Sequence, residues 1–163
     1  MKEHIYSFQP FYSADSGKLI LGSMPGGESL RRQQYYAYPR NAFWKIMGEL
    51  FEFDYQLPYE LRIKALVSNG IALWDTVHKC VRKGSLDADI TREEANDFEW
   101  LFSECPHIKK IFFNGQAAHK LFVKHCSKLD LPAVDIKVLP STSPANAAWS
   151  YQKKLAAWRA VLS

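Results

Sequence analysis

Four short apolar runs alternate with longer amphipathic stretches along the chain, and this alternation constrains the fold more than any other feature. The runs lie at residues 18–22, 70–75, 109–114 and 135–139, and each ends in polar or loop-forming residues. The stretches between or after them predict helices at 41–52, 58–68, 91–104, 115–127 and 149–162. Apolar strands separated by helices are typical of a parallel sheet covered on both faces. We therefore expect an α/β fold around a four-stranded parallel sheet.

One predicted helix carries a start signal. Thr91 is followed three residues later by Glu94, and this spacing is the signature of a capping box. We expect the third helix to begin there.

The size and composition of the chain fit one domain. Its 163 residues are 47% hydrophobic and 14% aromatic, enough for a full core, so we expect a single domain over residues 1–163. No apolar run approaches the roughly 20 residues of a membrane-spanning helix, and the N-terminal residues lack the pattern of a signal peptide. We expect a soluble, cytoplasmic monomer with no membrane partner.

The cysteines indicate neither a disulfide framework nor a metal site. Cys80, Cys105 and Cys126 are odd in number and widely spaced, without the close pairs of zinc sites. We expect reduced thiols, no bound metal and no cofactor.

The net charge of +4 is modest and does not by itself demand a nucleic-acid partner. The positions of the basic residues matter more, because several follow the first two apolar runs. If these residues form a stripe beside the opening of a site, they could bind the phosphates of a nucleic-acid backbone. If they are scattered, they are ordinary solvent-exposed charges. These residues are Arg31, Arg32, Arg40, Lys45, Lys79, Arg82 and Lys83. Lys153 and Lys154, on the last predicted helix, are expected to face solvent.

Ligands of parallel α/β sheets bind beyond the carboxyl ends of the strands. The segments 22–27, 75–82, 114–116 and 140–146 follow the predicted strands and should surround one crevice there. The first lies in LILGSMPGGESL, residues 19–30, whose glycines at 22, 26 and 27 should leave backbone N–H groups open at a strand-to-helix junction. Such a loop predicts one wall of a site for an anionic or polar ligand.

Two further stretches are unusual in content. QQYYAYPRNAFWKI, residues 33–46, gathers aromatic residues around Pro39 and Asn41, and VLPSTSPANAAW, residues 138–149, gathers hydroxyl groups, prolines and Asn146. In a purely structural alternative, the aromatic residues belong to the core and the two asparagines cap the helices that follow. Combined with the glycine loop, the two stretches favour a binding site.

The chain resembles the uracil-DNA glycosylase superfamily through GSMPG at 22–26, YYAYPRNAFWKI at 35–46 and LPSTSPAN at 139–146. It looks most like the hypoxanthine-DNA glycosylase branch, and its second motif is also similar to that of the mismatch-specific uracil glycosylases. The resemblance covers about residues 18–160. It implies a three-layer α/β/α sandwich that flips out and hydrolytically removes a deaminated base, foremost hypoxanthine and then uracil, from double-stranded DNA.

The chain departs from the superfamily pattern at Met24. Many members carry Asp or Asn there to handle the attacking water, and a thioether cannot take a proton. The resemblance to the hypoxanthine branch implies that Asn41 matters for excision. It also implies that Tyr36 stacks on the extruded base and that Asp75 stands where relatives have an Asn that reads the base edge.

Base removal makes physical demands that these residues can meet. Extruding a nucleotide costs a few kcal/mol of base stacking. Stacking of the extruded base on aromatic side chains could compensate for this loss, and the candidates are Tyr35, Tyr36, Phe43 and Trp74. Negative charge develops on the departing base, which N–H donors of the glycine loop and of Asn41 would stabilise. Asn41 could instead position water through its carbonyl oxygen, and the sequence leaves both roles open.

Asp75 also has two interpretations. Hypoxanthine and uracil present a ring N–H beside a carbonyl group, which a protonated carboxyl group could satisfy together and an ionised one could not. Burial among aromatic residues would favour the protonated form. In the alternative, Asp75 is a carboxylate that pairs with Arg82 or caps the following turn.

The expected site has three groups of residues. Catalysis is assigned to Gly22, Ser23 and Asn41. Base binding is assigned to Met24, Pro25, Gly26, Tyr36, Phe43, Trp74, Asp75 and Asn114. DNA contacts are assigned to Arg40, Ser141, Thr142, Ser143, Pro144, Ala145 and Asn146. Of these, Ala145 or Asn146 could wedge into the vacated stack.

Two rival functions remain open from the sequence. A small-molecule nucleotide hydrolase could use the glycine loop as a phosphate cradle, although the P-loop lysine is missing. A module that binds damaged DNA without chemistry is the second rival, because Met24 stands where many superfamily members have a catalytic residue.

Overall fold

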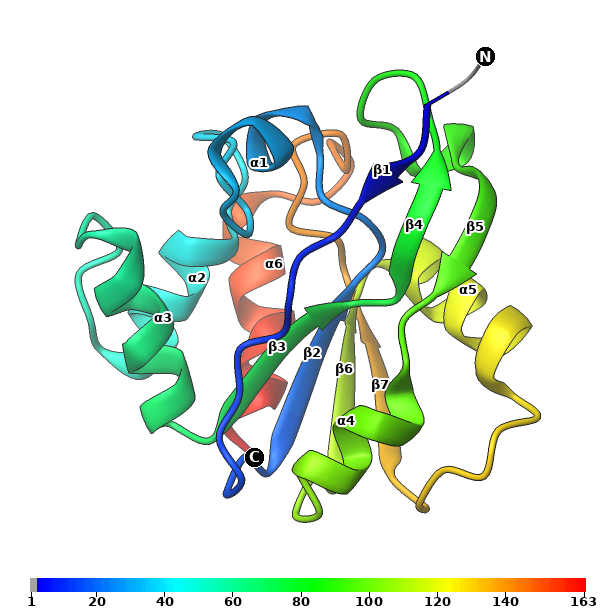
Figure 1. The fold of residues 1–163 in the computed structure, drawn as a ribbon. Helices are drawn as coiled ribbons and strands as arrows, with labels where there is room; N and C mark the ends of the chain where they lie inside the picture. Colours follow the sequence, from blue (N-terminus) through cyan, green and yellow to red (C-terminus); the bar gives the residue numbers. More distant parts are fainter. Residues whose placement is uncertain (1–2) are drawn as a thin grey trace.

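The computed structural model describes residues 3–163 and is built around a parallel sheet of four strands in the order β3-β2-β6-β7 (Figure 1). The strands are β2 (Lys18–Gly22), β3 (Ile71–Asp75), β6 (Lys110–Asn114) and β7 (Asp135–Leu139). Each begins within one residue of its predicted start. Nearly every side chain of β2, β3 and β6 is buried, because helices cover both faces, and this explains their continuously apolar sequences.

The helices form the two outer layers of an α/β/α sandwich (Figure 1). On one face lie α2 (Phe43–Phe51), α3 (Tyr59–Ser68) and α6 (Tyr151–Trp158), and on the other lie α4 (Phe98–Glu104) and α5 (Gln116–Cys126). The short α1 (Gly27–Arg32) follows the carboxyl end of β2. There are also two short 3-10 helices, η1 (Asp87–Asp89) and η2 (Arg159–Leu162). The predicted fold class is confirmed.

A second sheet, which the sequence analysis does not predict, lies beside the sandwich. It is antiparallel, in the order β1-β4-β5, and consists of β1 (Ile5–Tyr6), β4 (Val77–Val81) and β5 (Thr91–Ala95). The prediction of a helix and a capping box starting at Thr91 is therefore wrong. The helix begins only after Asp97, whose carboxylate accepts a hydrogen bond from the Trp100 backbone N–H. Pairing with β4 overrides the helix-favouring composition of residues 91–95.

The order of the strands positions the site. From β2 the chain crosses to β3 on one side, whereas from β6 it crosses to β7 on the other, so the winding reverses between β2 and β6. In doubly wound sheets, ligands bind beyond the carboxyl ends of the strands at such a switch point. The residues that end β2, β3 and β6 are Gly22, Asp75 and Asn114.

The three cysteines, Cys80, Cys105 and Cys126, are buried as free thiols. Within residues 3–163, no helix is both long enough and apolar enough to cross a membrane.

Candidate active site

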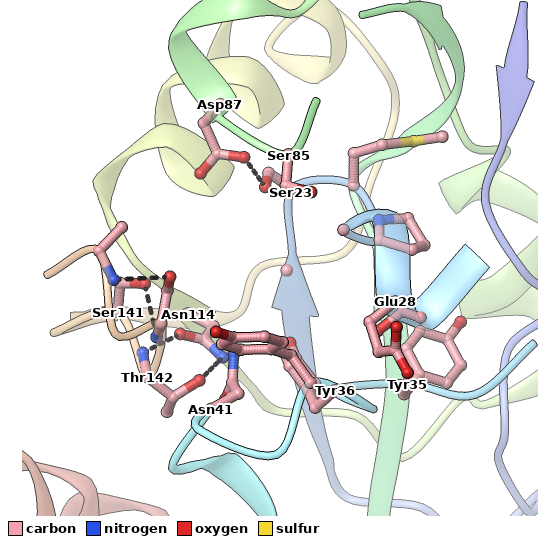
Figure 2. A pocket seen from close by; sticks show the side chains of 18 of the residues that line it. Ser23, Glu28, Tyr35, Tyr36, Asn41, Ser85, Asp87, Asn114, Ser141 and Thr142 are labelled. Atoms are coloured by element: carbon pink, nitrogen blue, oxygen red, sulfur yellow. Dashed lines mark hydrogen bonds between the residues drawn. The ribbon is translucent and has the colours of Figure 1, made fainter. Parts of the chain in front are cut away.

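A pocket of about 290 Å³ opens at the carboxyl ends of β2, β3 and β6 (Figure 2). Its walls come from the glycine loop after β2, the loop before α2, the loop after β4 and the loop after β7. Most of the predicted site residues line it: Gly22, Ser23, Met24, Pro25, Gly26, Tyr36, Asn41, Asp75, Asn114, Ser141, Thr142, Ser143, Pro144 and Ala145. The fold thus gathers segments that are far apart in the sequence.

The loop after β4 also lines the pocket, and the sequence analysis missed it. Residues 75–82 are predicted there to surround the crevice, but the chain leaves the pocket after Asp75 as β4 and returns at 85–87. The Ser85 hydroxyl accepts from the Gly27 N–H at 2.9 Å, and the Ser23 hydroxyl donates to Asp87 at 2.6 Å. β4, VHKCV, has no regular alternation of apolar and polar residues, so its sequence carries no period-two signal for this excursion.

Four predicted site residues lie outside the pocket lining. Phe43 is fully buried, Trp74 is buried and donates from its indole to the Phe8 carbonyl, and Arg40 is exposed. Asn146 donates to the Ser141 carbonyl and so braces its own loop. It does not cap α6, because the Ser150 hydroxyl does so by accepting from the Lys153 N–H.

The floor of the pocket explains why residue 22 is a glycine. A Cβ atom there would lie 2.5 Å from Asp75 Oδ1 and 2.8 Å from the Tyr36 hydroxyl, closer than nonbonded atoms tolerate. Two polar groups of the protein itself therefore occupy the space that a side chain at position 22 would fill.

The loop before α2 holds Tyr36 in an uncommon conformation. Its φ angle is 55°, in the left-handed region that residues with a Cβ rarely adopt. Both backbone polar groups of the preceding residue, Tyr35, are hydrogen-bonded. Its N–H donates to the Tyr59 hydroxyl at 3.0 Å, and its carbonyl accepts from the Trp44 indole at 2.8 Å. The Tyr36 ring then stacks on Phe43, with centroids 4.0 Å apart. Phe43 thus supports the aromatic wall from behind.

Two buried polar atoms on this floor have no hydrogen-bond partner within residues 3–163: the Tyr36 hydroxyl and Asp75 Oδ2. A buried polar atom without a partner is costly, so this pair indicates that a ligand supplies the missing bonds. Burial, with a smaller contribution from the charge of Asp87, raises the pKa of Asp75 to about 7. A neutral carboxyl group is therefore available near neutral pH.

Arg82 does not form the ion pair with Asp75 that the alternative interpretation expects. Its Nη2 donates to the Pro25 carbonyl at 2.6 Å and its Nε to the Gly84 carbonyl at 2.8 Å. The residue is buried behind the glycine loop, which leaves little of its side chain exposed for a contact with phosphate.

Asn41 presents one side of its amide to α2 and the other to the pocket. Its Oδ1 accepts from the Phe43 backbone N–H at 2.9 Å. The amide orientation is unambiguous, because a backbone N–H can only donate and so must face the oxygen. The N-cap of α2 is Ala42, so Asn41 stands one residue before the position that the structural alternative gives it, although its oxygen still accepts from the first N–H of the helix. This bond leaves Nδ2 as a donor.

Paired hydrogen bonds lock the loops after β6 and β7 together. Asn114 Nδ2 donates to the Thr142 hydroxyl at 3.0 Å, and the Thr142 N–H donates to Asn114 Oδ1 at 2.9 Å. The Thr142 carbonyl then accepts from the Ala42 N–H at 3.0 Å. The prediction that Lys154 faces solvent is wrong, because it is buried beneath this loop and donates to the Ser143 carbonyl at 3.0 Å. The walls of the pocket are therefore preorganised.

Comparison with known proteins assigns the family. The model of the Uracil DNA glycosylase superfamily matches residues 9–162. The chain belongs to this superfamily. It is 40% identical over 144 residues to the hypoxanthine DNA glycosylase of Methanosarcina acetivorans, covering 88% of each chain. It is 36% identical over 140 residues to that of Methanosarcina barkeri, covering 85% of this chain and 86% of the relative.

A solved structure agrees with the assignment to the uracil DNA glycosylase superfamily. The solution NMR structure of a Methanosarcina acetivorans protein, provisionally described as a uracil DNA glycosylase, matches with a TM-score of 0.78 and 34% identity. The match covers 99% of this chain and all of the other. The α/β/α sandwich is thus the fold of a superfamily relative.

Met24, at the position where this superfamily member departs from many others, belongs to the core. Its side chain is buried and packs with Val77 and Cys80. Within residues 3–163 of this glycosylase-superfamily chain, no cluster of three or more His, Cys, Asp or Glu is placed to hold a metal ion.

Proposed function

We propose that the protein is a monofunctional DNA N-glycosylase that flips a deaminated nucleotide, foremost deoxyinosine, out of double-stranded DNA and hydrolyses its glycosidic bond. The observation that carries this proposal is the pocket floor, where the Tyr36 hydroxyl and Asp75 Oδ2 are buried without partners beneath an aromatic wall. The names of the two Methanosarcina relatives support hypoxanthine as the base.

The floor is complementary to the edge of hypoxanthine. The base offers a ring N–H donor beside a carbonyl acceptor, and a neutral Asp75 can accept from the first and donate to the second. The raised pKa of Asp75, about 7, makes this form available near neutrality. The face of Tyr36 opposite Phe43 supplies a stacking surface that compensates for lost base stacking. Uracil has the same pair of groups and is expected as a second substrate.

Asn41 is assigned to the departing base. When the bond between C1′ and the base nitrogen breaks, negative charge develops on the base, and a fixed N–H donor lowers the energy of that state. Asn41 Nδ2 is such a donor, because the bond from Phe43 N–H to Oδ1 holds the amide in place. Of the two roles that the sequence left open, this geometry favours the donor role.

The loop after β7 is assigned to the DNA strand. It carries three hydroxyl groups at 141–143 along one edge of the pocket, and Ala145 is exposed near its tip. The hydroxyl groups of Ser141 and Ser143 can donate to phosphates that flank the lesion, because their hydrogen bonds within the loop use them as acceptors. Ala145 can enter the vacated stack. We expect a monomer to be sufficient.

The test is excision from duplexes that carry a single inosine or uracil. We expect abasic sites, revealed by alkaline cleavage, to form at the same rate with and without EDTA, since the proposed chemistry needs only water and protein groups. Binding to damaged duplex without cleavage would favour the damage-binding module, and hydrolysis of free nucleotides alone would favour the small-molecule enzyme. Activity that EDTA abolishes and a divalent metal restores would contradict the proposed mechanism.

Duplex affinity should depend steeply on salt. Phosphate contacts release counterions, so each true contact contributes a slope of roughly one in log affinity against log salt. Arg40 is exposed in the loop before α2, one residue from Asn41. Arg40→Gln should flatten the slope by roughly one. Lys109 lies at the opposite end of the sheet, so Lys109→Gln serves as the control and should leave the salt slope unchanged. Equal slopes for Arg40→Gln and the unmodified protein would remove Arg40 from the interface.

A further inference from the structure

Hydrolysis needs a group that orients the attacking water and accepts its proton, and the residues considered so far do not supply one. The Met24 thioether is buried in the core and cannot take a proton. Asn41 Oδ1 already accepts from the Phe43 N–H. Within the described residues 3–163, three carboxyl groups line the pocket: those of Glu28, Asp75 and Asp87.

Glu28 is already engaged. Its carboxylate accepts hydrogen bonds from the guanidinium groups of Arg31 and Arg32, and these bonds lower its pKa to about 2. A carboxylate held by two cations is a poor proton acceptor. In these ion pairs, the charges of Arg31 and Arg32 are partly neutralised by Glu28.

Asp75 lies too deep for the sugar. It is 3% exposed and packs over Gly22 at the end of β3, where it faces the edge of a bound base. A base held on this floor places its glycosidic bond toward the mouth of the pocket, so the reacting C1′ atom is separated from Asp75 by the base itself.

Asp87 occupies the mouth. It begins η1 and is exposed, and its Oδ1 accepts from the Ser23 hydroxyl at 2.6 Å. Figure 2 shows its second carboxyl oxygen turned toward the open space, on the wall opposite Asn41. Two neighbouring hydrogen bonds hold the loop after β4 against the glycine loop. They run from the Gly27 N–H to the Ser85 hydroxyl and from Arg82 to the Pro25 carbonyl.

We propose that Asp87, held by Ser23, is the catalytic residue that orients and deprotonates the attacking water. This assignment rests on the proposed glycosylase function. Burial is the main cause of the raised pKa values of Asp75, Tyr36 and Cys80, and the nearby charge of Asp87 adds to it. Asp87 and Asn41 then act from opposite walls, one on the incoming water and the other on the departing base.

The step balances without a cofactor. The bond between C1′ and the base nitrogen breaks, and its electron pair leaves with the base, where the Asn41 N–H group stabilises the charge. A lone pair of the water oxygen forms the new bond to C1′, and one water proton passes to the free oxygen of Asp87. That proton reaches the base through solvent, so the products are the free base and an abasic deoxyribose with a hydroxyl group at C1′.

The test compares Asp87→Asn with Asp89→Asn in single-turnover excision of hypoxanthine. Asn at position 87 keeps an oxygen that can accept from Ser23, so the loop stays in place while the proton acceptor is lost. General base catalysis contributes about 100-fold or more, so the excision rate should fall by about that factor while duplex affinity stays within about threefold. Asp89 is exposed in the same turn and outside the pocket lining, so Asp89→Asn should excise like the unmodified protein.

A second measurement separates a catalytic role from a structural one. In Asp87→Ala, sodium formate can supply a carboxylate, and it should restore part of the excision rate that the same concentration of sodium chloride does not restore. The assignment is overturned if Asp87→Asn excises at the normal rate, if its loss is matched by an equal loss of duplex affinity, or if formate restores nothing. A lack of excision by the unmodified protein would instead contradict the proposed function, so the two failures are distinguishable.

Discussion

Asn41→Ala is expected to lower the single-turnover rate of hypoxanthine excision by about a hundredfold or more, with little change in duplex binding. The loss of one preorganised donor to a developing negative charge typically has this size. Asn41 Nδ2 is such a donor, because the bond between Oδ1 and the Phe43 N–H sets its direction. Rates measured with excess enzyme isolate the chemical step, and fluorescence anisotropy on the same duplex measures binding.

Asn41→Asp separates catalysis from helix capping. An aspartate can still accept from the Phe43 N–H, so the start of α2 is preserved, but it cannot donate to the base. We expect Asn41→Asp to fold normally and to lose excision at least as strongly as Asn41→Ala, because its charge repels the departing base. Normal excision by Asn41→Asp would leave Asn41 with the helix-capping role alone.

The excision rate of the unmodified protein is expected to fall above about pH 7. The base-reading form of Asp75 is the neutral acid, and its pKa of about 7 means that this form is lost as pH rises. Each further pH unit above the pKa leaves about a tenth of the neutral form, so the rate at pH 9 should be about a hundredfold below its plateau. Asp75→Asn should retain excision and lose this alkaline fall, since an amide offers the same donor and acceptor at every pH.

Rates between pH 5 and 9 for both proteins and both bases check this prediction. The charged groups that act on Asp75 are Asp87, which raises its pKa, and Arg82, which lowers it, and neither is altered in the variant. An Asp75→Asn protein that is folded but inactive, or whose pH profile matches that of the unmodified protein, would remove Asp75 from the base-reading role.

The same titration should be visible without DNA. The folded protein keeps the Asp75 proton up to about pH 7, whereas the unfolded chain loses it near the ordinary value of 3.8. Stability from this group is therefore fully present below the lower value and is lost as pH rises to about 7, by about 1.4 kcal/mol per pH unit. Urea unfolding at pH 5 and pH 8 should show a smaller decline for Asp75→Asn, which identifies the titrating group independently of activity.

The fold was largely predictable because its signals are local. Strands buried on both faces must be apolar throughout, so β2, β3 and β6 were recognised within one residue. The rule that ligands bind beyond the carboxyl ends of parallel strands then predicted that Gly22, Asp75 and Asn114 lie at one crevice. The prediction failed at residues 91–95, whose composition favours a helix, because pairing with a distant strand decided their conformation.

The sequence by itself determined the layered architecture, the family resemblance and most of the residues around the pocket. Only the tertiary structure decided which atoms of those residues are free to act. It shows that the Asn41 oxygen is occupied, that Arg82 is buried behind the glycine loop, and that position 22 is a glycine to accommodate Asp75 and Tyr36. It also brings Asp87 to Ser23, across 64 positions of sequence. The physical reason is that strand periodicity and loop chemistry are encoded by neighbouring residues, whereas hydrogen-bond occupancy and burial depend on contacts between distant segments.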